Sequence, residues 1–244
     1  MAGEPLLDAV GIHKQFGALA ALDGVDLKIG PGEAIGIVGP NGAGKTTLLN
    51  VLAGTTSPSA GSVTFRGADV TRSGAARRAR LGIGRAHQIP RPFGAMTVFE
   101  NCFVAASTGG GLRRRAAYTR CLEVLERCRL ADVADRRADT LGLLARKRLE
   151  LARALATNPV LLLLDEIGAG LTDAEAAELV TLINALHRDD GIAIVWIEHI
   201  VHVLVQVVTR LICMDAGRVI ADGEPSAVMS DARVVDAYLG TAAA

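Results

Sequence analysis

The sequence predicts an α/β fold, in which a mainly parallel sheet is covered by helices on both faces and a further helical segment is inserted. Apolar segments of strand length alternate with segments of helical periodicity over much of the 244-residue chain. Two segments, "AIGIVG" and "VLLLL", are continuously apolar, which is typical of strands buried on both faces of a parallel sheet. The stretch from about residue 90 to 158 has helical periodicity only, and it interrupts the alternation.

The first part of the chain contains three predicted strands and a helix. The segment "VDLKIG" alternates between apolar and polar residues, which predicts a half-exposed strand, whereas "AIGIVG" predicts a buried one. The segment "KTTLLNVLAG" has helical spacing, and we expect that helix to stop at Gly54. The segment "GSVTFRG" then predicts a short strand.

The middle of the chain, from about Thr97 to Asn158, is predicted to be helical. Three segments have helical periodicity: "TVFENCFVAA", "AAYTRCLEVLERCRL" and "RKRLELARALAT". Between the first two, "STGGGLRRR" predicts an exposed, flexible, basic loop. We therefore expect one core domain, residues 1–89 and 159–244, and an inserted helical subdomain, residues 90–158.

The alternation of strands and helices resumes after Pro159. The segment "VLLLLDE" predicts a strand, "DAEAAELVTLINALHRDD" a helix and "GIAIVWIEH" another strand. The segments "RLICMD" and "RVIADG" predict a two-stranded ribbon that turns at Ala216 and Gly217.

Composition and charge narrow the class of protein. Half of the residues are apolar but only 3% are aromatic, so a large core must consist mostly of Leu, Val, Ile and Ala. Lys and Arg balance Asp and Glu, at 26 each, and this gives no support for a nucleic-acid partner. We find no signal-peptide pattern, and the most apolar window, "HIVHVLVQVVTRLICMDAG", is too broken to span a bilayer.

The four cysteines show no CxxC spacing. They predict buried thiols in a reducing compartment, not disulfides or zinc ligands. With the absence of an evident signal peptide or membrane span, they lead us to expect a soluble, cytoplasmic chain.

The strongest chemical signal is "GPNGAGKTT", Gly39 to Thr47, which matches G-x-x-x-x-G-K-[ST] between a buried strand and a helix. Glycines let backbone N–H groups from Asn41 to Thr46 converge on phosphate oxygens, and the helix N-terminus adds a favourable dipole. Lys45 supplies a positive charge to the β- and γ-phosphates, and the Thr46 hydroxyl can bind Mg²⁺. The alternative is a glycine-rich turn that only caps a helix, and the flanking strand and helix argue against it.

A second signal is the acidic pair that ends "LLLLDE". Asp165 and Glu166 follow a buried strand, at the edge where open α/β sheets bind ligands. There Asp165 can hold Mg²⁺ through its water shell, and Glu166 can orient or deprotonate an attacking water. An acidic loop without function is the alternative, and the phosphate-binding pattern in the same chain argues against it.

Three single residues are weaker candidates. His199 follows the strand of "VWIEH" and should emerge at the same sheet edge, where a neutral imidazole can contact a γ-phosphate oxygen or the water. A polar residue that only caps the strand is the alternative, and the same caution applies to Gln88 in "RAHQIPRPFG". Phe16 can stack on a base, although most single Phe residues belong to the core.

Taken in this order, the motifs resemble those of the ATP-binding subunits of ABC transporters, over nearly the whole chain. The resemblance implies a P-loop NTPase core of RecA-like type with an inserted helical subdomain, and hydrolysis of ATP with bound Mg²⁺. The implied nucleotide contacts are Phe16, Gly39, Asn41, Gly42, Ala43, Gly44, Lys45, Thr46 and Thr47. The implied catalytic residues are Lys45, Glu166 and His199, and the implied Mg²⁺ ligands are Thr46, Gln88 and Asp165.

Single motifs match named parts of that family. Phe16 matches the aromatic residue that stacks on adenine, and His199 matches the switch histidine. Gln88 matches the Q-loop glutamine, which senses Mg²⁺ and the γ-phosphate and faces the membrane subunit. "AGLT", Ala169 to Thr172, matches the D-loop.

The wording of several segments, including "HQIPRPFGAMTVFENCFVAA" and the tail "VVDAYLG", resembles the ATPases of branched-chain amino-acid uptake systems and their urea or amide relatives. This implies a peripheral subunit at the cytoplasmic face of the cell membrane, held by separate permease subunits near "RPFGAMTVFEN". It also implies an extracytoplasmic solute-binding protein as an indirect partner. The residues themselves do not identify the solute, because solute contacts lie on other subunits.

The sequence departs from the family pattern at two places. Ile167 stands where a proline usually follows the catalytic glutamate, which removes no reactive group. In the signature stretch Leu141 to Ala145, Gly142 replaces the serine that donates to the γ-phosphate, Leu144 replaces a glycine and Ala145 a glutamine. The helix N-terminus and its dipole are expected to remain.

The family's geometry decides which site this change affects. Two domains enclose two ATP molecules, and each site combines the Walker motifs of one chain with the signature of the other. The altered signature therefore predicts a sound site on Lys45, Glu166 and His199 and a weakened site on the partner. A heterodimer with a second ATPase subunit is favoured, whereas in a homodimer both sites would be impaired.

Other classes of function remain as alternatives. The altered signature favours a regulatory or weakly hydrolysing ATP-binding module, while the retained Lys45, Glu166 and His199 oppose it. Soluble ABC-type ATPases of DNA repair or translation usually carry coiled-coil insertions or two cassettes, and this chain shows neither. A P-loop kinase would need an acceptor site and a lid, and no segment indicates one.

Overall fold

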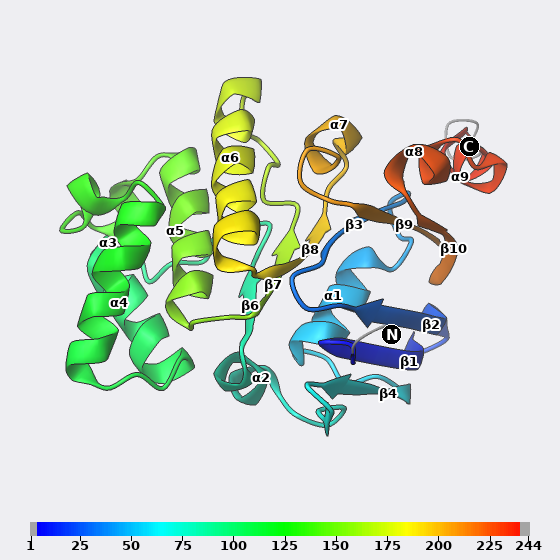
Figure 1. Cartoon of the computed structure of the whole chain (residues 1–244), viewed down its shortest axis with the longest axis horizontal. Coiled ribbons are helices and arrows are strands. Elements are labelled where there is room, and N and C mark those ends of the chain that lie inside the picture. Colours follow the sequence, from blue (N-terminus) through cyan, green and yellow to red (C-terminus); the bar gives the residue numbers. More distant parts are fainter. Residues whose placement is uncertain (1–3, 240–244) are drawn as a thin grey trace. The chain divides into compact units, whose positions relative to one another are not determined.

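The computed structural model describes residues 4–239, which form two compact units (Figure 1). One unit is built from the residues up to Ala75 and from Ala193 onward, and the other from Ala76–Ile192. Each unit contains part of the predicted parallel strand pattern.

An antiparallel sheet forms one part of the first unit, with the strand order β2-β1-β4-β5. Its strands are β1 Leu7–Phe16, β2 Leu19–Ile29, β4 Ala60–Phe65 and β5 Ala68–Asp69. In β1, Leu7, Ala9 and Ile12 are fully buried while their neighbours are more exposed, as expected when only one face of an antiparallel sheet covers the core. The predicted strands in "VDLKIG" and "GSVTFRG" are confirmed as parts of β2 and β4.

Parallel strands form the other part of the first unit. The strand β3 lies between β8 and β9 and is parallel to both, and β10 is antiparallel to β9. Their bounds are β3 Ala34–Val38, β8 Ala193–Ile197, β9 Arg210–Asp215 and β10 Arg218–Gly223. Every residue of β3 and β8 is buried, which explains why their sequences are continuously apolar.

Short helices complete the first unit. They are α1 Lys45–Ala53, α7 Val201–Leu204, α8 Pro225–Met229 and α9 Ala232–Leu239. As predicted, α1 stops at Gly54, whose φ of 74° lies in the left-handed region that favours glycine. The ribbon of β9 and β10 turns at Ala216 and Gly217, also as predicted, and both have positive φ. The helices α8 and α9 pack against this ribbon.

The second unit combines two parallel strands with several helices. The strands β6 and β7 pair in parallel, and all five residues of β7 are buried. The elements are α2 Ala75–Leu81, β6 Ile83–Ala86, α3 Val98–Val104, α4 Arg114–Arg127, α5 Leu143–Ala156, β7 Leu161–Asp165 and α6 Asp173–Asp190, with short 3₁₀ turns at Ala131–Val133 and Ala138–Thr140. The helices α3, α4 and α5, drawn in green in Figure 1, pack against one another.

The predicted flexible loop "STGGGLRRR" is partly wrong. The helix α3 continues into a π-helix at Ala105–Gly109, where the Ser107 hydroxyl donates to the Phe103 carbonyl at 2.6 Å. Glycine therefore ends this helical segment instead of preventing it. The exposed basic part of the prediction holds, because Arg113, Arg114 and Arg115 are all exposed.

These observations confirm the predicted α/β fold with a mainly parallel strand pattern and a group of helices. The four cysteines are buried free thiols, as predicted, and burial raises the pKa of the Cys121 thiol to about 11. Within residues 4–239 no helix is both long enough and apolar enough to cross a membrane. The division into 1–89 and 159–244 against 90–158 stays a prediction, and residues 1–3 and 240–244, including Gly240 of the tail motif, lie outside the described residues.

Candidate functional site

The glycine-rich loop joins the end of β3 to the start of α1 in the first unit. Gly39, Gly42 and Gly44 have φ angles of 143°, 82° and 97°, which residues with a Cβ rarely adopt. A Cβ on Gly39 would lie 2.0 Å from the Met214 carbonyl oxygen, and one on Gly44 would lie 2.5 Å from that of Ala21. At Gly39 and Gly44, glycine is required both by the backbone conformation and by the close approach of neighbouring strands.

Lys45 is the first residue of α1, and its side chain turns back into this loop. The residue is only 5% exposed, and its ammonium donates to the carbonyl oxygens of Gly39 at 2.7 Å and Pro40 at 2.9 Å. The charge is held at the N-terminus of a helix whose first turn has no acidic residue. Backbone N–H groups and a positive charge gathered there favour an anion such as phosphate.

The other predicted nucleotide contacts in this loop and helix differ in exposure. Asn41, Gly42 and Thr46 are exposed, whereas Ala43 is buried and Thr47 is half-buried. The tip of the loop and the Thr46 side chain are therefore accessible to a ligand.

Two further predicted site residues belong to the first unit. Phe16 ends β1 and is 52% exposed, with the Lys14 ammonium 5.0 Å from its ring centroid. The alternative that Phe16 is a core residue is wrong, and its exposed ring suits stacking on a base. His199 follows β8 and is exposed, directly after the buried Glu198, so it emerges at a strand end as predicted.

The acidic pair lies in the second unit, at the end of β7. Asp165 is the last residue of the strand and is buried. Its carboxylate pairs with Arg85 of the neighbouring strand β6, with Nη2 and Oδ2 2.9 Å apart. Sequence reasoning missed Arg85, because its role arises only from the pairing of β6 with β7 and no local pattern marks it.

Glu166 and Gln88, predicted separately, lie in contact in the second unit. The Gln88 amide Nε2 donates to the Glu166 carboxylate Oε2 at 2.5 Å. Glu166 has a φ of 46°, a left-handed conformation that is uncommon for a residue with a side chain and is often found at functional sites. Ile167, in place of the family's proline, is buried and so anchors the chain just after Glu166.

Three side chains of α5 hold the backbone around Gln88. The Lys147 ammonium donates to the Gln88 carbonyl at 2.6 Å, and Arg153 donates to the Arg91 carbonyl at 2.8 Å. The buried Glu150 carboxylate accepts from the His87 and Arg91 N–H groups, each at 3.4 Å, and from Arg153 at 3.0 Å. The backbone is thereby fixed while the Gln88 side chain reaches Glu166. Lys147, Glu150 and Arg153 were not predicted, because they carry no motif of their own.

Burial lowers the pKa of His87, the neighbour of Gln88, and the Arg85 charge lowers it further, although the Glu150 and Asp165 carboxylates oppose this. The imidazole is therefore neutral at pH 7, so the Gln88 segment carries no additional charge there.

The altered signature stretch leads into an intact α5. Gly142 is the N-cap residue, with φ −69° and ψ 171° and no side-chain cap hydrogen bond. A Cβ placed on Gly142 would meet nothing within 4 Å, so neither backbone nor space requires glycine there. Leu143 is 45% exposed, and a Cβ on Gly170 of the D-loop would lie 3.4 Å from its side chain.

Two models of known protein families match the chain. A family model described as ABC transporter matches residues 22–169. The chain belongs to the ABC transporter family. A second model, described as branched-chain amino acid ATP-binding cassette transporter, matches residues 218–244 of this ABC chain.

Several relatives of this ABC chain resemble it over its full length. It is 37% identical to the high-affinity branched-chain amino acid transport ATP-binding protein LivG of Escherichia coli K12, over 98% of this chain and 99% of that protein. It is similar to the crystal structure of the ADP conformation of MJ1267, an ATP-binding cassette, with a TM-score of 0.88, 31% identity and coverage of 98% and 100%. The dimeric post-hydrolysis structure of the cassette MJ0796 with ADP and Pi matches with a TM-score of 0.80, 26% identity and coverage of 90% and 98%.

These comparisons confirm the resemblance drawn from the motifs. They confirm the P-loop nucleotide-binding fold and the prediction of an ABC ATPase. The roles of single residues stay predictions, and so do the ligation of Mg²⁺ and the altered signature's effect.

Proposed function

We propose that this chain is the ATP-hydrolysing subunit of an importer for branched-chain amino acids. The observation that carries the proposal is the buried Lys45, which lies inside a glycine-built loop at a helix N-terminus. The full-length likeness to LivG supplies the transport context and the solute class. The same likeness favours a subunit that drives transport over a regulatory module.

Within this proposal, each predicted site residue has a distinct task. The loop amides from Asn41 onward and the Lys45 ammonium bind the β- and γ-phosphates. Glu166 orients and deprotonates the attacking water, and His199 contacts the γ-phosphate. The exposed ring of Phe16 stacks on adenine.

The predicted metal ligands have side chains whose chemistry suits a magnesium ion. Thr46, Gln88 and Asp165 offer hydroxyl, amide and carboxylate oxygens, the hard donors that Mg²⁺ prefers. Mg²⁺ usually keeps water and phosphate ligands and takes few from the protein. When bound, the ion would neutralise charge on the phosphate oxygens.

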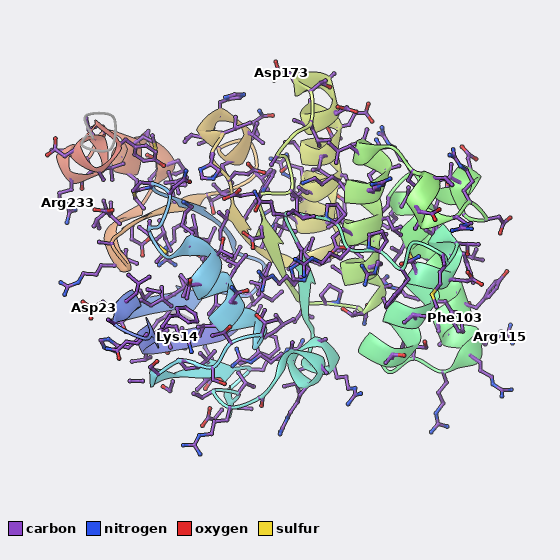
Figure 2. All side chains as sticks on the ribbon, turned by 180° about the vertical axis from the view of Figure 1, so that it is seen from behind. Lys14, Asp23, Phe103, Arg115, Asp173 and Arg233 are labelled. Carbon is purple, nitrogen blue, oxygen red and sulfur yellow. The ribbon has the colours of Figure 1, made fainter. Side chains whose placement is uncertain are left out.

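We place the permease contact on the helical part of the second unit. An apolar hollow of about 330 Å³ is lined by Met96, Phe99, Glu100, Phe103, Val104 and Tyr118. The Phe99 ring centroid lies 5.1 Å from that of Tyr118, and Tyr118 is 53% exposed. Figure 2 labels Phe103 and Arg115 on this helical part. An exposed apolar hollow supports a protein partner, and the predicted permease segment "RPFGAMTVFEN" contributes to it.

We further propose that the partner cassette is a different ATPase subunit, and that both sit at the cytoplasmic face of the membrane. The signature stretch Leu141 to Ala145 lacks the serine hydroxyl, so this chain would complete its partner's site weakly. Its own site, completed by an intact signature, would hydrolyse ATP. An extracytoplasmic solute-binding protein would deliver the amino acid to the permeases.

The test is ATP hydrolysis by the purified complex of this chain with its partner ATPase and permeases. Lys45→Ala should lower turnover at this chain's site by about 100-fold or more, because a charge that stabilises the transferred phosphate is lost. Lys28, whose side chain is 71% exposed and lies 3.9 Å from the Asp8 carboxylate, gives the matched control Lys28→Ala, which should leave turnover unchanged. Equal turnover in both variants would contradict the ATPase role, and unchanged leucine, isoleucine and valine uptake in cells lacking the chain would contradict the solute class.

A further inference from the structure

A tyrosine of the last helix bonds directly to the phosphate loop within the first unit. The Gly39 N–H donates to the Tyr238 hydroxyl oxygen at 2.8 Å, across 199 residues of sequence. Gly39 is the first residue of the loop that precedes α1, and Tyr238 lies on α9. The bond therefore joins the C-terminal segment to Gly39, the loop residue whose backbone conformation and close neighbours require glycine.

The C-terminal segment contacts the loop at a second point. In the turn between β9 and β10, the Gly217 N–H donates to the Ala43 carbonyl at 3.1 Å. The helices α8 and α9 pack against this same ribbon, and β9 is the direct neighbour of β3. The loop is thus held near its start by Tyr238 and near its end by Gly217.

Gly39 links this bond to the charge in the loop. Its N–H is bonded to Tyr238, and its carbonyl accepts from the Lys45 ammonium at 2.7 Å. Its φ of 143° and the approach of the Met214 carbonyl leave the residue little freedom to adjust. The two peptide groups that flank Gly39 are therefore anchored, one by Tyr238 and the other by Lys45.

Gly39 is itself a predicted nucleotide contact, but its N–H is not among the donors predicted to face the phosphates. The amides predicted to face the phosphates begin at Asn41, so the Gly39 N–H lies outside that set. The Tyr238 hydroxyl is half-buried, and burial raises its pKa above the usual range, although the Gly39 bond opposes this. The hydroxyl therefore stays neutral between pH 6 and 9, and its effect should not vary over that range.

We propose that Tyr238 is a positioning residue, through which the C-terminal helix holds the phosphate loop in the conformation that binds nucleotide. On this proposal the segment that matches the branched-chain cassette model, residues 218–244, contributes to nucleotide affinity. This inference rests on the proposed function, because it assumes that the loop binds ATP and ADP.

The C-terminal segment offers a matched pair for the test, the hydroxyl of Tyr238 and the hydroxyl of Ser230. Tyr238→Phe removes only the hydroxyl and should weaken ADP and ATP binding about three- to tenfold, the scale of one hydrogen bond. Ser230→Ala removes a hydroxyl of the same C-terminal segment that donates to the Ser226 and Ala227 carbonyls, each at 3.0 Å, and it should leave affinity unchanged. In the complex, Tyr238→Phe should raise KM by a similar factor while kcat stays within about twofold, because the reacting groups are untouched.

A purely structural tyrosine would give a different result. It would lower the thermal unfolding midpoint of Tyr238→Phe without changing the Kd for ADP at 20 °C, and that outcome overturns the proposal. So does a loss of affinity that appears only above pH 9. Failure of the unaltered chain to bind nucleotide at all would instead overturn the proposed function itself.

A measurement without a variant at Tyr238 provides a second test. Incorporation of 3-fluorotyrosine gives two ¹⁹F resonances, and Tyr118→Phe identifies the one that remains as Tyr238. Adding ADP should shift or sharpen the Tyr238 resonance, because the loop it holds becomes ordered around the phosphates. A Tyr238 resonance that ignores saturating ADP would contradict the coupling.

Discussion

The phosphate loop of the first unit and the acidic edge of the second, which the proposed function assigns to the same ligand, are built in opposite ways. The loop uses the backbone, since Gly39 and Gly44 allow close approach and the Lys45 ammonium rests on loop carbonyls. The acidic edge uses paired side chains, Arg85 with Asp165 and Gln88 with Glu166. The loop therefore depends on the shape of its backbone, and the acidic edge depends on the charges and hydrogen bonds of its side chains.

The difference implies that the two regions fail differently. Apart from Lys45, a backbone loop tolerates changes of side-chain charge but not an added Cβ, because its donors are N–H groups fixed by φ and ψ. An edge of paired side chains tolerates changes of volume but not loss of one partner, because a buried charge or amide is then left with fewer hydrogen bonds. Isosteric substitutions should therefore be harmful at the edge, and the smallest possible enlargements should be harmful in the loop.

The largest effect is expected from the isosteric change Glu166→Gln. An amide occupies the same space as the carboxylate but cannot accept a proton, so turnover at this site should fall by about 100-fold or more. Nucleotide affinity should change little, since the loop is untouched. Phosphate-release kinetics and ADP titration of the same preparation measure the two quantities, and turnover above one tenth of the original would contradict the role of Glu166.

Within the loop, the variants Gly39→Ala and Gly42→Ala separate the effect of a close contact from that of backbone strain alone. Both positions have positive φ, but a Cβ on Gly39 would lie 2.0 Å from a carbonyl oxygen, whereas one on Gly42 meets nothing within 4 Å. Gly42→Ala should cost about 1–2 kcal/mol of unfolding free energy from backbone strain. Gly39→Ala should cost about 3–5 kcal/mol, because the strand neighbour must also move.

Urea denaturation of the two variants measures this difference, and ADP titration measures its effect on binding. The Gly39 variant should also lose most of its ADP affinity. Equal destabilisation of the two variants would mean that the approach of β9 does not shape the loop, and the contrast between shape and charge would then lose its support.

The same contrast explains how much the sequence could predict. The loop's motif is continuous, so the strand, the glycines and Lys45 could all be inferred from neighbouring residues. Asp165 and Glu166 could be placed because they end a continuously apolar strand. The fold class followed from similar local patterns, together with the resemblance of the motifs to a known family.

Other features left no local pattern. The strand β1 contains Gly11 and several polar residues, and three register shifts disturb its pairing with β2, so its alternation is irregular. The strand β6 has only four residues, too few to show a period. Arg85 and Tyr238 acquire their partners across 80 and 199 residues, where only the folded chain brings donor and acceptor together.

We expect a smaller effect in the altered signature, which has neither the strained backbone of the loop nor the paired side chains of the acidic edge. Gly142 has φ −69° and open space around its missing Cβ, so Gly142→Ser fits without strain. As an N-cap, serine should stabilise α5 by only a few tenths of a kcal/mol relative to glycine. Combined with Leu144→Gly and Ala145→Gln, it should restore a hydroxyl donor and raise turnover at the partner's site several-fold, the scale of one hydrogen bond.

The readout must separate the two sites of the heterodimer. Turnover is measured in a complex whose own site is silenced by Glu166→Gln, so that hydrolysis reports only the site completed by this signature. Gly142→Ala with the same two companions is the control, since it supplies the Cβ without the hydroxyl. If the serine and alanine versions give equal turnover, the missing hydroxyl is not what limits the partner's site, and the leucine-rich turn is a tolerated variant.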